Sequence, residues 1–134
     1  MKGGKLKEDR LLRKLRRLSR EILAALRVKD AKLSVFLLPD TRMKQLKRRF
    51  FKVGAGERAD ILSFPEPRGF PHPESRDRFL GEIYLNRDLK DAGLKDYGFL
   101  LIHGLLHLLG CTHKKKSDIL KMEKLERRLK KLLP

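Results

Sequence analysis

The sequence has little that could form covalent cross-links or cross a membrane. Its 134 residues contain no tryptophan and one cysteine, Cys111, which excludes a disulfide within the chain. The longest apolar run, residues 99–110, is interrupted by His103 and His107 and is too short to span a bilayer. The first twenty residues are basic and lack the apolar core of a signal peptide. We therefore expect a cytoplasmic protein without a membrane-spanning segment.

Acidic residues are also scarce, because 34 Lys and Arg residues are balanced by only 17 Asp and Glu, a net charge of +17. The excess is uneven: it is +13 over residues 1–58, −2 over residues 59–113 and +6 over residues 114–134. A strongly basic chain favours a polyanionic partner such as RNA, DNA or a membrane surface. The alternative is a solvated basic surface with no partner. The one-sidedness of the charge favours nucleic acid.

Apolar periodicity predicts seven elements and one long loop. We expect helices over 8–28, 41–50, 94–109 and 118–132, and strands over 33–38, 59–64 and 79–86. Residues 65–78 contain four prolines and are predicted to form a surface loop. The helix over 94–109 is apolar on nearly all sides, which indicates burial, and Gly110 is placed to end it. We expect an α+β fold: residues 1–134 form one small domain in which helices cover a three- or four-stranded sheet.

Three of the four histidines lie in the stretch HGLLHLLGCTH, residues 103–113. His103 and His107 are four residues apart on a predicted helix, so their side chains share one face. Gly110 allows the chain to turn back, which can bring His113 to the same point. Histidines in an apolar helix are commonly core residues bonded to backbone, but three buried imidazoles without partners would be costly. Three imidazoles around one ion leave a fourth position open, as in a catalytic zinc site. Nickel, copper and iron are compatible with the same ligands.

The residue after the first histidine is Gly104. The spacing H-x-x-x-H-x-x-G-x-x-H is also that of metzincin peptidases, which carry a general-base glutamate at this position. The sequence therefore retains the metal spacing without supporting peptidase chemistry. We expect the missing side chain at Gly104 to open space beside the metal, which would suit a bulky anionic substrate such as a phosphodiester.

Several segments resemble the YbeY family of bacterial metal-dependent endoribonucleases. The histidine stretch is similar to that family's H-G-x-L-H-L-x-G-[YH]-D-H, ADILSFPEP (59–67) to its T-D-V-L-S-F-P, and LGEIYLN (80–86) to its L-G-D-I-x-I. KMEKLERRLKKLL (121–133) resembles its closing M-x-x-L-E-x-x-I-L helix. The resemblance implies a metzincin-like core with a zinc-type site made by His103, His107 and His113. It also implies cleavage of single-stranded RNA, maturation of small-subunit ribosomal RNA, ribosome quality control and a small-subunit partner.

The sequence departs from this pattern at three places. Thr112 replaces the family's Asp before the third histidine, the family's Arg has no single match, and no strand pattern precedes the first helix. For the Arg, Lys52, Arg58 and Arg49 are candidates, and we assign catalytic roles to Lys52 or Arg58. The RNA-binding residues are expected to be Arg48, Arg49, Lys114, Lys115 and Lys116. Two other functions stay open: an RNA-binding ribosome-assembly factor whose metal is structural, and a metzincin-like hydrolase with another substrate.

Overall fold

A computed structural model describes residues 2–51, 58–66, 78–110 and 115–133. Its elements are α1 (Lys2–Ala25), β1 (Ala31–Leu38), α2 (Asp40–Phe51), β2 (Ile61–Pro65), β3 (Arg78–Asn86), α3 (Leu94–Leu108) and α4 (Lys116–Lys130). All seven predicted elements are present, and most ends lie within two or three residues of the prediction. The clear exception is α1, which begins at Lys2 where the sequence predicted a start near Glu8. The predicted α+β fold is confirmed.

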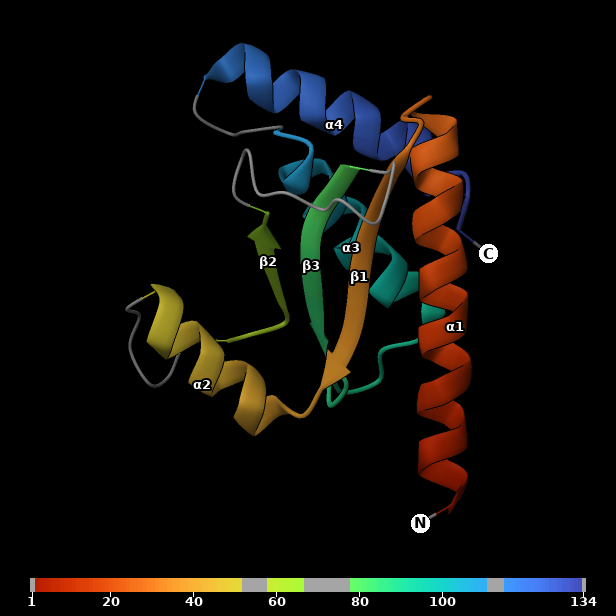
Figure 1. Cartoon of the computed structure of the whole chain (residues 1–134), viewed down its shortest axis with the longest axis vertical. Helices are drawn as coiled ribbons and strands as arrows, with labels where there is room; N and C mark the ends of the chain where they lie inside the picture. The colour runs from red at the N-terminus through yellow and green to blue at the C-terminus, as the bar shows by residue number, and fades with distance from the viewer. Residues whose placement is uncertain (1, 52–57, 67–77, 111–114, 134) are drawn as a thin grey trace.

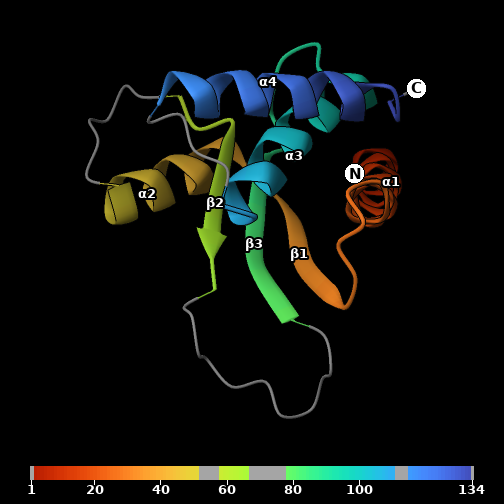
Figure 2. The ribbon, with the colours of Figure 1, turned by 90° about the horizontal axis from the view of Figure 1, so that it is seen from above.

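The three described strands form one mixed sheet in the order β1-β3-β2. β1 pairs with β3 in parallel, and β2 pairs with β3 antiparallel. β1 and β2 are the two edges of this described sheet, and the chain before β1 forms the helix α1. α1 and α3 lie on one side of the sheet, α2 lies beside β2, and α4 runs across one end (Figure 1). The view from above shows α4 crossing over α3 (Figure 2).

The main core lies between the sheet and the helices α1, α3 and α4. Its side chains follow the alternation of the strands and the helical spacing of the three helices. The most completely buried are Leu15, Ile22, Ile83, Leu85, Leu101, Leu105 and Leu129. A smaller cluster of Met43, Ala59 and Leu62 joins α2 to the opposite face of the sheet. Among the described residues, no helix has the length and apolarity needed to cross a membrane.

Two glycines have clear structural roles. Gly110 follows α3 with a φ of 92°, a left-handed conformation that glycine adopts without steric cost, and its N–H donates to the His107 carbonyl at 3.0 Å. This confirms the predicted end of the helix. Gly81 has a φ of 142° and follows a shift in the register between β1 and β3. A Cβ at Gly81 would collide with the Phe64 carbonyl oxygen and lie 2.9 Å from the Pro65 Cα atom.

Candidate metal centre

Two histidines on consecutive turns of α3 point at one another. The Nε2 atoms of His103 and His107 are 3.0 Å apart, and their rings meet edge to face with centroids 4.5 Å apart. Helical spacing explains why these rings meet, since residues i and i+4 share a face. The His103 side chain is half-buried and the His107 side chain is exposed, so the pair is accessible to solvent.

Glu126 of α4 contacts the outer side of this pair. Its Oε1 atom lies 3.3 Å from His103 Nδ1, and the Glu126 side chain is 25% exposed. When His103 carries its proton on Nδ1, that N–H donates a hydrogen bond to the carboxylate, and Nε2 keeps the lone pair that can bind a metal. Carboxylate–histidine pairs of this kind orient metal-ligating imidazoles. The contact between Glu126 of α4 and His103 Nδ1 of α3 would therefore determine whether His103 Nε2 is available to bind a metal.

The geometry of the pair fits a shared cation. Two imidazole nitrogens bound to one tetrahedral zinc are about 3.4 Å apart, given Zn–N bonds of about 2.1 Å. The 3.0 Å separation between the two Nε2 atoms is close to this value, so little movement would be needed. Among the described residues, no third His, Cys, Asp or Glu completes the set. His113, the third predicted ligand, lies outside the described residues, as does Cys111.

The missing side chain at Gly104 leaves no open space beside the histidine pair. A Cβ at this position would lie 2.7 Å from Ile61 Cδ1, 2.9 Å from Ser63 Oγ and 3.4 Å from Ile83 Cδ1. The expectation that Gly104 opens room beside the metal is therefore wrong. One helical residue rotates the side-chain direction by about 100°, so the position next to His103 faces the sheet. Gly104 instead allows α3 to pack closely on β2 and β3.

The predicted catalytic and RNA-binding residues are spread over several elements. Arg58 is exposed, pairs with Asp60 at 3.0 Å, and lines a pocket of about 380 Å³ with Phe99 and Leu100 on the turn of α3 before His103. Arg48 and Arg49 are exposed in the last turn of α2. Lys115 and Lys116 are exposed at the start of α4. Lys52 and Lys114 lie outside the described residues. The assignments of these residues stay predictions.

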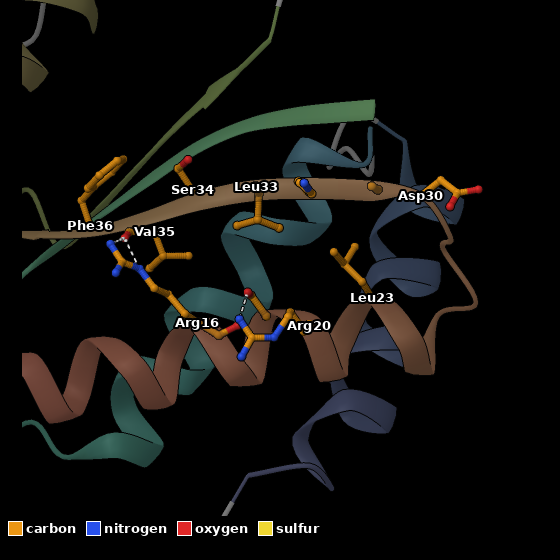
Figure 3. Close-up of a pocket in the computed structure, with 11 residues that line it drawn as sticks. Arg16, Arg20, Leu23, Asp30, Leu33, Ser34, Val35 and Phe36 are labelled. Atoms are coloured by element: carbon orange, nitrogen blue, oxygen red, sulfur yellow. Dashed lines mark hydrogen bonds between the residues drawn. The ribbon is translucent and has the colours of Figure 1, made fainter. Parts of the chain in front are cut away.

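A separate pocket of about 600 Å³ lies between α1 and β1, at the edge of the sheet opposite β2 (Figure 3). Arg16 closes part of this edge, because its Nε and Nη2 atoms donate to the Val35 carbonyl at 3.3 and 3.1 Å. A helix side chain that occupies a carbonyl of an edge strand in this way opposes pairing of that strand with another chain. Since α3 packs on β2 and β3, this pocket is not part of the histidine site.

A family comparison decides the classification. The family model described as Endoribonuclease YbeY matches residues 2–133, almost the whole chain. The chain belongs to this family. The YbeY resemblance inferred from the histidine stretch is thus confirmed.

Individual YbeY relatives are about one-third identical to this chain. A protein named Endoribonuclease YbeY from Thermus thermophilus is 35% identical over 120 residues, which are 81% of each chain. The Endoribonuclease YbeY of Myxococcus xanthus is 34% identical over 122 residues, and that of Anaeromyxobacter dehalogenans is 31% identical over 128. The matched region spans 40% of the Myxococcus protein and 63% of the Anaeromyxobacter protein, so those two relatives are substantially longer.

Glu126 is the site residue that the sequence analysis missed. It coincides with the Glu of the YbeY closing-helix pattern, and it lies four residues after the buried Met122, on the inward face of α4. A carboxylate on an otherwise apolar stripe was the available signal. The family pattern has an Asp before the third histidine, where this chain has Thr112. Glu126 supplies a carboxylate beside the first histidine, His103.

Proposed function

We propose that this protein is a metal-dependent endoribonuclease that cleaves single-stranded RNA during maturation of the small-subunit ribosomal RNA. The observation that carries the proposal is the pair of Nε2 atoms 3.0 Å apart, with Glu126 on His103 Nδ1, in a chain of the YbeY family. The proposal includes the small ribosomal subunit as partner, a role in ribosome quality control and action in the cytoplasm. The basic surface supports it, because RNA presents a dense row of phosphates.

His103, His107 and His113 would hold one zinc ion. When bound, zinc would supply Lewis acidity and make water a stronger nucleophile near neutral pH. The chain's own contribution is positioning: α3 holds His103 and His107 on one face, and Glu126 keeps the His103 proton on Nδ1 so that Nε2 stays available. Arg58, or Lys52, would offset charge that develops on the phosphate oxygens.

The absence of a carboxylate at position 104 supports RNA over peptide as substrate. Gly104 is enclosed by Ile61 and Ser63, so this position offers no general base and no room for one. A peptidase of the metzincin type depends on a glutamate there. In the proposed reaction, bound zinc would supply the acidified water, and cationic side chains would stabilise the phosphate oxygens.

The test combines a cleavage assay with metal analysis. The His107→Ala variant should lose at least a hundredfold of the cleavage rate on single-stranded RNA and most of its bound zinc. His72→Ala is the matched control, because His72 is the remaining histidine and lies outside the 103–113 stretch. Folded His107→Ala protein that still cuts RNA would refute the metal mechanism. If the wild-type protein binds RNA but does not cleave it with any divalent metal, the result would favour an RNA-binding assembly factor.

A further inference from the structure

Aromatic side chains form a continuous row on the face of the sheet opposite α3. The Phe36 and Tyr84 rings stack with centroids 5.2 Å apart, and Tyr84 meets Phe64 edge to face at 5.6 Å. Phe64 in turn meets Phe50 at 5.3 Å and Phe51 at 5.7 Å. This aromatic row therefore crosses β1, β3 and β2 and continues onto α2. Phe36 and Tyr84 are register partners, which explains why their rings lie side by side.

The end of the aromatic row on α2 is open to solvent. Phe50 is 56% exposed and Phe51 is 47% exposed. A pocket of about 330 Å³ opens beside Phe50 and is also lined by Phe64 and Tyr84. Ligand pockets begin at about this size. Large aromatic rings left this exposed beside a pocket provide flat surfaces on which a planar group can stack.

The helix that carries this exposed end is basic. Between Asp40 and Phe51, α2 carries five basic residues and one acidic residue, the basic ones being Arg42, Lys44, Lys47, Arg48 and Arg49. The Arg49 guanidinium carbon lies 5.5 Å from the centre of the Phe50 ring. Nucleic-acid surfaces that bind single strands combine aromatic rings with a basic groove. An apolar protein partner would have to cover these cations, whereas RNA phosphates would pair with them.

Two carboxylates line the same pocket and restrict what can enter it. Glu82 accepts a hydrogen bond from the Tyr84 hydroxyl, and Glu66 lines the pocket near Pro65. Carboxylates repel phosphate but accept hydrogen bonds from the amino groups of bases. Burial, followed by the bond to Glu82, raises the pKa of Tyr84 to about 12, so its ring stays neutral at physiological pH. The pocket therefore suits a base, with the phosphates placed along α2.

The aromatic row and the histidine pair lie on either side of one strand. Phe64 of β2 belongs to the aromatic row, whereas the preceding residue, Ser63, faces Gly104 on the histidine helix. β2 is one of the two edge strands of the order β1-β3-β2, so no further strand of the described sheet lies beyond it. α2 packs on the face of the sheet that carries Phe64, and α3 packs on the opposite face, so the two helices flank this edge strand (Figure 1).

We propose that the aromatic row, entered at Phe50 and Phe51, is a stacking platform for the bases of single-stranded RNA, and that Arg48 and Arg49 hold the adjoining phosphates. This inference rests on the proposed function, to which it adds the surface that holds the substrate on the way to the histidines. Stacking on a single ring contributes affinity without reading sequence, so the platform should accept most bases. The two glutamates should favour cytosine over uracil, because cytosine has an amino group.

The test measures binding of fluorescein-labelled twelve-residue 2′-O-methyl oligocytidylate and oligouridylate by anisotropy, with strand integrity checked on gels. Phe50→Ala should bind oligocytidylate about five- to tenfold more weakly, and Phe50→Trp should bind as the wild type does. Leu120→Ala is the matched control, because Leu120 is 57% exposed but lies on α4. Arg48→Ala should reduce the slope of log affinity against log salt by about 0.7, whereas Phe50→Ala should leave it unchanged.

The outcomes separate this inference from the proposed function. Unchanged RNA affinity in Phe50→Ala, with RNA cleavage intact in the wild type, would overturn the platform and leave the nuclease standing. Phe50-dependent binding without any cleavage would support the platform and refute the nuclease. If Phe50→Ala and Leu120→Ala weaken RNA binding equally, the exposed rings are not an RNA-binding surface. The same conclusion follows if Phe50→Ala abolishes capture of a protein partner and leaves RNA affinity unchanged. Circular dichroism of each variant confirms that it is folded.

Discussion

Replacing Glu126 by Ala should weaken zinc binding although Glu126 is not itself a proposed zinc ligand. The substitution removes the acceptor that lies 3.3 Å from His103 Nδ1. His103 could then carry its proton on either nitrogen, and the form protonated on Nε2 cannot ligate a cation. The ring would also lose the contact that fixes its orientation.

The expected loss follows from the exposure of the pair. Removing a carboxylate behind a ligating histidine typically lowers metal affinity by about 10- to 100-fold. The His103 and Glu126 side chains are 41% and 25% exposed, so solvent screens their interaction. We therefore expect the lower end, about tenfold, which corresponds to about 1.4 kcal/mol. Glu126→Gln should recover part of this loss, because the amide oxygen can still accept from Nδ1–H.

The assay is titration of metal-free protein with zinc in competition with a chelating indicator. Glu123→Ala is the matched control, since Glu123 is exposed one turn earlier on α4. Thermal unfolding of the metal-free variants should differ little, because a partly exposed hydrogen bond contributes only about 1 kcal/mol. Equal zinc affinity in Glu126→Ala and Glu123→Ala would show that Glu126 does not position His103.

Two further predictions concern stability. Gly81→Ala should destabilise the protein by about 3 kcal/mol in urea unfolding, because its positive φ and the fixed Phe64 carbonyl leave no room for a Cβ. Gly104→Ala should cost only about 1 kcal/mol, since it meets side-chain ends that can rotate and alanine favours a helix; equal losses would contradict this comparison. Hydrogen bonds from Lys44 and then Asn86 lower the pKa of Asp40, so its contribution is present above the ordinary Asp pKa of 3.8 and disappears as the pH falls through the lowered value. The stability difference between wild type and Asp40→Asn should therefore shrink on acidification below about pH 4, and a difference that is constant with pH would refute this assignment.

The local structure of this protein was predictable because each element carries its own periodicity. The i, i+4 spacing placed His103 and His107 on one face of α3, and Gly110 marked the end of that helix. The alternation in 79–86 and the proline after 59–64 marked the two strands. These features depend on interactions between residues a few positions apart, so short stretches of sequence are enough to predict them.

Tertiary structure decided what those elements place together. His103 and Glu126 are 23 residues apart in sequence, and only the packing of α4 on α3 brings the carboxylate to the imidazole. The direction of Gly104 likewise depends on which side of α3 meets the sheet, which its neighbouring histidine could not reveal. The aromatic row joins residues from three strands and a helix. The amino-acid sequence alone therefore determined the elements and the histidine spacing. The carboxylate support and the aromatic surface arise from contacts between distant segments, which local patterns do not encode.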